Sequence, residues 1–471
     1  MRLTDLCIQV RAALSDLPPN EPIWDCGHAV VSILSTRPEE VIELAQGMLH
    51  AWPYRDVPVC WRRAFEEGSL WRVLLRLETR DEESSEAAQE PRGKKRARDG
   101  SLVIARDNDY DDGHATTSND WLTDIVEILD RALILTGAPM RRTLINTIMN
   151  ELAAYAESSD LLDYKSLPTS FSQTAKKMRH DYQKTFIRFK RPTLETFQHH
   201  LDTATTPLIM TDVLSDWPAT SDLSHAWSNP QYLYTLTLGG RRLVPVELGR
   251  SYTDSDWGQK IMPFSTYLRT YLLDPNPKQT GYLAQHDLLE QIPCLSADTM
   301  TPDYCYTSPP PPPPESAVAP QPELEAPLRN AWLGPAGTVS PLHTDPYHNI
   351  LCQVVGRKYV RLYPPGETKR VYPRGVDETG VSMENTSSVD VGLARKLFET
   401  EHEDMDGASE DEAENDLDQQ KIDFESQFPG FKDAEFMEGV LEEGECLYIP
   451  VGWWHYIESL ETSFNVSYWW N

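Results

Sequence analysis

From about residue 170 onward, the chain is dominated by short runs of β-branched and aromatic residues separated by Gly, Pro and Asp. The clearest runs are TPLIMTDVL, QYLYTLTLGGRRLVPVEL, NILCQVVGRKYVRLYPP, GECLYIPV and TSFNVSYWW. This sequence pattern is typical of short strands joined by turns. Many short strands in succession predict a sandwich or a barrel. We therefore expect one β-rich domain over residues 170–471.

Two unusual segments interrupt this predicted domain. Pro309–Pro314 is an unbroken proline run, which favours a polyproline II conformation on the surface. Residues 399–418 hold eleven Asp or Glu and no Lys or Arg, a composition that disfavours a packed structure. We predict disordered insertions at about 307–325 and 399–420. Long insertions between strands cost little stability because the entropy of loop closure grows slowly with length.

Residues 1–165 indicate a separate all-α module. In PEEVIELAQGMLHAW, Val41, Leu44, Ala45 and Leu49 recur at helical intervals. A disordered loop is predicted at about 82–118, where the chain becomes too polar to bury a core. Such a module binds a protein partner or braces its neighbour, and the sequence leaves both open.

A second helix is predicted to begin near Asp120 and to end at Gly137. Its apolar stripe consists of Trp121, Ile125, Ile128, Leu129 and Leu133. A further helix is expected over residues 141–156.

Charge narrows the range of partners. The formal net charge is -30, which disfavours direct binding to nucleic-acid phosphates and suits a basic protein partner, such as a ribosomal protein, a chromatin-associated protein or a histone tail. The alternative is that the charge only maintains solubility. The cluster Arg92–Arg98 reads either as a nuclear-localisation signal or as a solvated loop.

No signal peptide or membrane span is expected, and seven scattered cysteines without a CxxC pair indicate reduced thiols. A nuclear or cytoplasmic location, or both, follows as the expectation.

The segment SPLHTDPYHN holds a candidate metal site. In an extended strand His343 and Asp345, two positions apart, point to the same face. The third candidate donor is His455, in GECLYIPVGWWHYIES, while His348 has the wrong parity. Two histidines and one carboxylate form the facial triad of Fe(II) oxygenases, which leaves positions for a 2-oxo acid and O2. The alternative for an isolated HxD is a surface pair.

Lys358 is a candidate anion-binding residue. It shares a strand face with Val360 and Leu362 in RKYVRLY, which we expect to be the second strand of a β-hairpin. A lysine on an inward face is costly unless it meets an anion, such as the distal carboxylate of 2-oxoglutarate. The alternative is a lysine that extends to water.

These motifs resemble the JmjC family of 2-oxoglutarate oxygenases. The resemblance rests on HTD, Lys358 and IPVGWWH, and extends to LVPVELGRSYTDSDW, GYLAQHDLLEQIP, AWLGPAGTVSPLHTDPYHN and the terminal SYWW. It implies an α+β chain in which an all-α module precedes a double-stranded β-helix, with Fe(II) held by the three donors above. It also implies that Tyr282, Ser340 and Asn349, with Lys358, hold 2-oxoglutarate.

The resemblance implies a pocket for a basic side chain as well. Its residues would be Glu247, Tyr252, Trp257, Gln285 and Trp332. A carboxylate and aromatic faces suit a guanidinium. Taken alone, Glu247 could be a surface strand residue, and Tyr282 and Trp332 core residues.

The sequence thus predicts an Fe(II)- and 2-oxoglutarate-dependent dioxygenase that uses O2 to hydroxylate an arginine side chain of a protein. The alternative is a histone methyl-lysine demethylase with the same chemistry. A non-catalytic barrel that acts as a scaffold is the third hypothesis.

Overall fold

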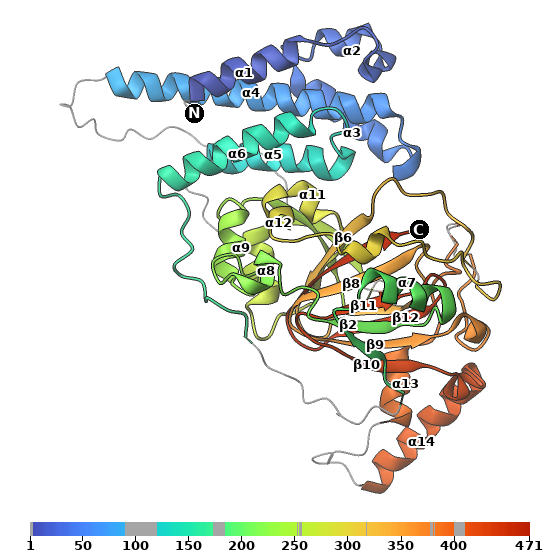
Figure 1. Cartoon of the computed structure of the whole chain (residues 1–471). Coiled ribbons are helices and arrows are strands. Elements are labelled where there is room, and N and C mark those ends of the chain that lie inside the picture. The colour runs from blue at the N-terminus through green and yellow to red at the C-terminus, as the bar shows by residue number, and fades with distance from the viewer. Residues whose placement is uncertain are drawn as a thin grey trace. The chain divides into compact units, whose positions relative to one another are not determined.

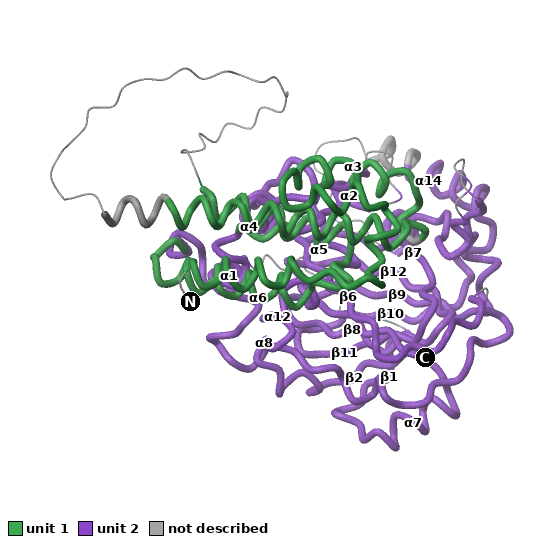
Figure 2. Tube along the Cα trace, turned by 90° about the horizontal axis from the view of Figure 1, so that it is seen from above, with its two compact units in different colours: residues 1–162, 241–243 green, residues 163–240, 244–471 purple. Residues whose placement is uncertain are grey.

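The computed structural model describes residues 3–89, 120–172, 184–251, 253, 257–316, 318–376, 380, 382–399 and 410–471. Two compact units are distinguished in Figure 2. The helical unit comprises residues 1–162 and 241–243, and the barrel unit comprises residues 163–240 and 244–471. The division falls near the expected boundary, although the short segment 241–243 clusters with the helices. No helix within the described ranges is both long and apolar enough to cross a membrane.

Six α-helices form the described part of the helical unit (Figure 1). They are α1 (Leu3–Ser15), α2 (His28–Ser32), α3 (Pro38–His50), α4 (Val59–Gln89), α5 (Trp121–Thr136) and α6 (Arg142–Ser158). The signals that bound α5 act as predicted. The Asp120 side chain accepts a hydrogen bond from the Thr123 backbone N–H, and Gly137 ends the helix in the left-handed conformation. In α3, Val41 and Ala45 are buried, whereas Leu44 is exposed.

The predicted disordered loop is wrong at its beginning, because α4 continues to Gln89. The helix is anchored by buried residues such as Val73 and Leu77. Once a helix is nucleated, each added residue such as Glu or Ala extends it at little cost. The remainder of the loop, including Arg92–Arg98, lies outside the described residues.

A buried ionic cluster lies inside the helical unit. Arg63 is fully buried and donates hydrogen bonds to the carboxylates of Glu21 (2.5 Å), Glu66 and Glu67 (2.6 Å). Arg141 adds a second cation, 2.6 Å from Glu67. Burial, the largest influence, raises the pKa of Glu66 to about 7.

The barrel unit is a double-stranded β-helix made of two facing sheets. The larger sheet has the strand order β1-β2-β11-β8-β13-β6-β5-β3-β4. Its strands are β1 (Ile187–Lys190), β2 (Leu208–Thr211), β3 (Leu243–Leu248), β4 (Gly258–Pro263), β5 (Gly281–His286), β6 (Leu328–Gly334), β8 (His348–Val355), β11 (Cys446–Ile449) and β13 (Ser463–Trp470).

The smaller sheet has the order β10-β9-β12-β7. Its strands are β7 (Val339–His343), β9 (Lys358–Tyr363), β10 (Met437–Leu441) and β12 (Trp454–Ser459). All five residues of β10 pair with residues 358–362 of β9, and β12 lies between β9 and β7 and pairs with both.

Successive side chains of each strand point to opposite faces of its sheet. The side chains between the two sheets form an inner core, and those on the outer face of each sheet form an outer core. Leu351 and Leu447 of the larger sheet meet Val360 and Leu362 of the smaller sheet in the inner core. The other face of the larger sheet packs under short helices. These are α7 (Leu194–Thr203), α8 (Pro218–Ser221), α9 (Pro230–Leu236), α10 (Phe264–Tyr267), α11 (Leu288–Gln291) and α12 (Pro293–Ala297). The outer face of the smaller sheet packs against α13 (Val391–Phe398) and α14 (Glu410–Gln427).

The predicted β-hairpin after HTD is wrong. Strand β8 belongs to the larger sheet and β9 to the smaller one, so the chain passes between sheets at Gly356 and Arg357. Gly356 has a φ of +71°, and a methyl group there would overlap the Thr462 carbonyl. Glycine permits this sharp passage because it lacks a Cβ atom. Similarly, the start of the run QYLYTLTLGGRRLVPVEL was expected to be β-rich, but residues 231–236 belong to α9, which Asn229 caps.

Both predicted insertions are more ordered than expected. Residues 410–420 belong to α14, whose buried Phe424 anchors the helix to the outer core of the smaller sheet, while 400–409 lie outside the described residues. The described residues between 307 and 325 form no helix or strand. The described part of that segment is nevertheless held by hydrogen bonds, for example from Asn471 Nδ2 to the Pro322 carbonyl (2.9 Å).

Candidate metal centre

Three candidate metal donors meet in the barrel unit. His343 ends β7 and lies directly opposite His455 of β12 in the antiparallel register. Asp345 follows in the loop after β7. Its Oδ1 atom lies 3.6 Å from His343 Nε2, and its Oδ2 atom lies 3.4 Å from His455 Nε2. One donor atom from each residue lies within 4.8 Å of the other two. This spacing suits donors that share one ion.

The backbone orients both imidazole rings. His343 Nδ1 lies 2.7 Å from the Pro341 carbonyl, and His455 Nδ1 lies 3.1 Å from the Trp453 carbonyl. Since a carbonyl only accepts, each Nδ1 carries the proton and donates it. With Nδ1 engaged in this way, Nε2 is the ring nitrogen that each histidine can offer to a metal, and both Nε2 atoms face Asp345. Such orientation of a ring by its second nitrogen is a regular feature of metal-binding histidines.

Electrostatics favour the protonation states that a metal requires. Burial, followed by the nearby His455, lowers the pKa of His343 to about 4, which favours the neutral ring. Burial alone would raise the pKa of Asp345, but interactions with His455, His343 and Asn349 lower it overall. Asn349 Nδ2 donates to Asp345 Oδ2 (3.3 Å), so β8 of the larger sheet supports the carboxylate. The buried Oδ1 atom of Asn349 has no hydrogen-bond partner among the described residues.

Lys358 and Tyr282 form a buried pair. Lys358 is 2% exposed, and its Nζ atom donates to Tyr282 Oη (3.1 Å). Tyr282 also hydrogen-bonds Ser340, which links β5, β7 and β9. Burial lowers the pKa of Lys358 to about 7. Among the described residues, no carboxylate pairs with this ammonium group, so the site can accept an anion from outside.

The five residues assigned to a substrate pocket are not all brought together. Glu247 on β3 lies opposite Tyr282 on β5, and it accepts a hydrogen bond from Trp257 Nε1 (3.3 Å). Trp332 Nε1 donates to Ser467 Oγ (3.0 Å). Gln285 is exposed at a bulge of β5, with a φ of +46°. Within the described ranges it makes no hydrogen bond to the three donors. Tyr252 lies outside the described residues.

Two polar interior residues were not predicted. Asn465 and Ser467 alternate along β13 with Phe464 and Val466, which belong to the core on the opposite face. Both residues are buried, and in the part of the chain that the structure describes the Oδ1 atom of Asn465 has no hydrogen-bond partner. The period-two alternation in TSFNVSYWW was a usable signal, but only the register of β13 shows which face lines the barrel.

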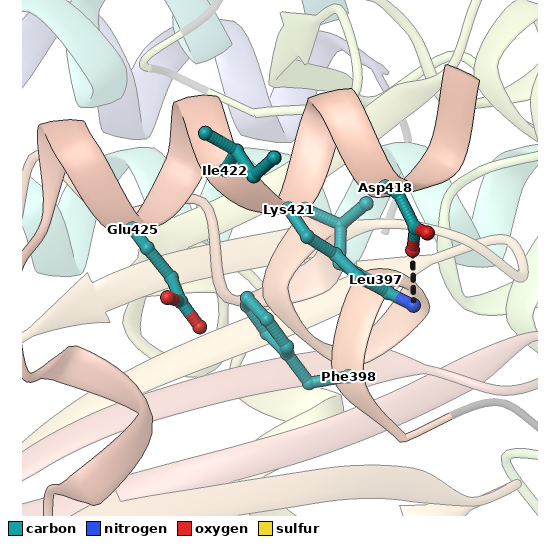
Figure 3. A pocket seen from close by; sticks show the side chains of 6 residues that line it. All are labelled: Leu397, Phe398, Asp418, Lys421, Ile422 and Glu425. Atoms are coloured by element: carbon teal, nitrogen blue, oxygen red, sulfur yellow. Dashed lines mark hydrogen bonds and ion pairs between the residues drawn. The ribbon is translucent and has the colours of Figure 1, made fainter. Parts of the chain in front are cut away.

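A separate pocket lies between α13 and α14, as Figure 3 shows. Its volume is about 440 Å³, and Leu397, Phe398, Ile422 and Lys421 contribute to its lining. It contains none of the three metal donors. The chemistry therefore concentrates at the centre formed by β7 and β12, not at this pocket.

Comparison with known proteins agrees with this geometry. The family model described as a cupin-like domain matches residues 194–471, which include all three candidate metal donors. Lysine-specific demethylase 8 of Danio rerio is 30% identical over 447 residues, which cover 93% of this chain and 88% of that protein. The chain belongs to the JmjC oxygenase family.

Two other relatives have a higher identity over a shorter range. Lysine-specific demethylase 8 of Xenopus tropicalis is 39% identical over 280 residues, 59% of this chain and 51% of that protein. Jumonji C domain-containing protein 5 of Drosophila melanogaster is 34% identical over 282 residues, 59% of this chain and 58% of that protein. The alignments thus span just over half the length of these two relatives.

The JmjC centre provides two imidazole nitrogens and one carboxylate, a set that suits Fe(II) in non-haem oxygenases. Lys358 of the smaller sheet adds a buried ammonium group, and Glu247 of the larger sheet adds a half-buried carboxylate.

Proposed function

We propose that this chain is an Fe(II)- and 2-oxoglutarate-dependent oxygenase that hydroxylates an arginine side chain in a basic protein. One observation carries the choice of substrate. Glu247 is half-buried, burial raises its pKa, and among the described residues no Lys or Arg pairs with it. A desolvated carboxylate without a cation is costly, and an incoming guanidinium would relieve that cost.

The residues present fit the co-substrate. 2-Oxoglutarate is a dicarboxylic acid, and Lys358 with Tyr282 offers an ammonium group and a hydroxyl group for its distal carboxylate. The unpartnered Oδ1 of Asn349 and the neighbouring Ser340 add polar atoms near the donors. The hydrophobic alternative at position 358 would be more stable without a ligand, so the lysine supports an anion-binding role.

The roles of the residues follow from their positions. His343, Asp345 and His455 would hold the metal, while Lys358 and Tyr282 would fix the orientation of the acid. Fe(II), with 2-oxoglutarate and O2, would supply the oxidant that inserts oxygen into a C–H bond. Glu247, on the strand beside Tyr282, would hold the cationic side chain so that one carbon approaches the metal. Burial of the centre would exclude water.

Demethylation of methyl-lysine is the second candidate. The relatives named lysine-specific demethylases favour it. A methylated ammonium group is usually held by several aromatic rings. Glu247 instead has one described indole partner, Trp257, and its carboxylate suits the several N–H donors of a guanidinium. We therefore favour arginine hydroxylation.

Mass spectrometry distinguishes the two reactions. Arginine-rich and methyl-lysine peptides would be incubated with the chain, Fe(II), 2-oxoglutarate and O2. We expect one added oxygen atom on arginine. Loss of a methylene group with release of formaldehyde would instead establish demethylation, and no succinate with any peptide would favour the scaffold hypothesis.

A Glu247→Gln variant tests the carboxylate directly, because it keeps the size of the side chain and removes the charge. We expect it to lose turnover of the arginine peptide but to retain 2-oxoglutarate binding. The exposed Glu323 provides the matched control as Glu323→Gln, which should retain full turnover. Equal turnover by Glu247→Gln and the unmodified chain would contradict the assignment.

The partner follows from the same chemistry. An acidic chain with a carboxylate in its substrate site suits a basic protein, such as a ribosomal or chromatin-associated protein or a histone tail. We propose that the chain acts in the nucleus, the cytoplasm or both. We also propose that the helical unit binds a protein partner.

A further inference from the structure

We propose that the proline run Pro309–Pro314 is a docking site for a partner domain whose aromatic-lined groove binds polyproline II. This inference is independent of the proposed oxygenase reaction. Consecutive prolines fix φ near -65° and keep each preceding residue out of the helical region. Such a run therefore favours a polyproline II helix, which has three residues per turn, up to Pro314, where a turn begins that the Ser316 N–H closes on the Pro313 carbonyl (2.9 Å).

The exposure of this segment repeats with the same period. Ser308, Pro311 and Pro314 are exposed, whereas the four intervening prolines are half-buried. Since every third residue of a polyproline II helix lies on one face, these three residues form a continuous outward ridge. Domains that recognise polyproline II read prolines at this spacing in shallow aromatic grooves. The ridge thus presents the surface that such a groove binds.

The opposite face of the run is fixed to the barrel. His348 Nε2 donates to the Pro310 carbonyl (2.9 Å), and His348 Nδ1 accepts from Tyr448 Oη (2.8 Å). At the start of the run, Gln198 makes two hydrogen bonds with the backbone of Ser308, each 2.9 Å. At the end, Ser316 packs against Gly452 of the β11–β12 turn. A ridge fixed at both ends and in the middle loses little further entropy on binding.

Charge restricts the kind of partner. The sequence contains no Lys or Arg between Lys278 and Arg329, whereas Asp303 and Glu315 flank the run on either side. A groove with acidic residues at its rim would be repelled. We therefore infer a groove whose rim is neutral or basic.

The test uses the full chain and isolated proline-binding domains. An isotope-labelled WW domain and an EVH1 domain, each with a neutral or basic rim, would be titrated with the chain and followed by NMR. We expect at least one of them to bind through its aromatic groove. An SH3 domain with an acidic rim serves as the contrast and should bind more weakly. Binding by none of the three, or the tightest binding by the SH3 domain, would overturn the proposal.

Two double variants separate the ridge from general stiffness. Replacing Pro311 and Pro314 by Ala removes the outward prolines, and we expect about tenfold weaker binding or more. Replacing Pro310 and Pro313 by Ala removes as many fixed φ angles from the inner face, and we expect a loss of about twofold. Equal losses for both variants would refute the ridge. Analytical ultracentrifugation completes the test, because a dimer that the outer variant dissociates would identify a second copy of this chain as the occupant and overturn the proposal.

Discussion

Replacing Lys358 by Met should stabilise the chain and abolish its binding of 2-oxoglutarate. Burial lowers the pKa of this lysine from 10.5 to about 7. Each pKa unit corresponds to about 1.4 kcal/mol, so the buried amine costs ~4 kcal/mol at pH 7. Methionine has a similar length and no charge. The substitution also removes the hydrogen bond from Lys358 to Tyr282, which reduces this gain in stability by about 1 kcal/mol. The expected net gain in the free energy of unfolding is about 3 kcal/mol.

The gain should depend on pH in a defined direction. Because the pKa of Lys358 is lower in the folded chain than in the unfolded chain, the unfolded chain binds more protons between pH 7 and pH 10.5. The stability contributed by this group in the unmodified chain therefore rises with pH across that window. The advantage of Lys358→Met should be greatest near pH 7 and below, and should vanish toward pH 10.5.

Urea unfolding followed by tryptophan fluorescence measures both effects. The unmodified chain should gain stability when 2-oxoglutarate is added with Mn(II), and Lys358→Met should not. The control is Lys278→Met, which removes an exposed lysine and should behave like the unmodified chain. The reasoning fails if Lys358→Met is less stable than the unmodified chain at pH 7, or if it retains the full stabilisation by the co-substrate.

Three further outcomes are expected. Asp345→Asn should weaken Mn(II) binding about a hundredfold in calorimetric titrations, since it removes the charged donor, and an unchanged affinity would exclude this residue as a ligand. Gly356→Ala should lower the free energy of unfolding by about 2 kcal/mol or more, because its φ is +71° and a methyl group would overlap the Thr462 carbonyl. At Gly366 no described atom beyond the adjacent residues lies within 4 Å of the new methyl group, so Gly366→Ala should change the free energy of unfolding by less than about 0.5 kcal/mol, and equal losses would refute the argument. Burial raises the pKa of Glu66 from 4.5 to about 7, so the stability that this residue contributes should fall as pH rises between these values. The lowered pKa of His343 acts in the opposite direction. Glu66→Gln should therefore make the slope of the free energy of unfolding against pH more positive over this window in urea unfolding, and an unchanged slope would contradict the assignment.

The candidate metal centre could be predicted from the sequence because the motifs that indicate it are local. The HxD spacing places two donors together, and the segment around His455 has a strand, a turn and a further strand. The structure brings these three side chains within the reach of one ion. Lys358 was recognisable because a charged residue interrupts an otherwise apolar strand face. The helix boundaries at Asp120 and Gly137 were similarly local, since capping depends on neighbouring residues.

Features that depend on distant contacts were not predictable. Whether β8 and β9 form a hairpin or cross between sheets depends on their pairing with β13 and β12. The acidic segment at 410–420 looks unable to fold by itself, but buried Phe424 and Phe428 follow it and anchor the helix to the smaller sheet. Asn465 could be assigned to the interior only after the register of β13 was known.

The pairing of β9 with β10 has a consequence for how this chain can change. Residues 364–436 leave the smaller sheet and return to it with Met437 directly opposite Leu362, so the two ends of this long excursion are held side by side. A change in the length of this excursion should therefore leave the position of His455, on the adjacent strand β12, nearly unchanged. A foreign domain grafted into the acidic stretch between α13 and α14 would extend an appendage without displacing the donors. This site offers evolution, or an engineer, a place to attach new binding partners to an unaltered oxygenase core.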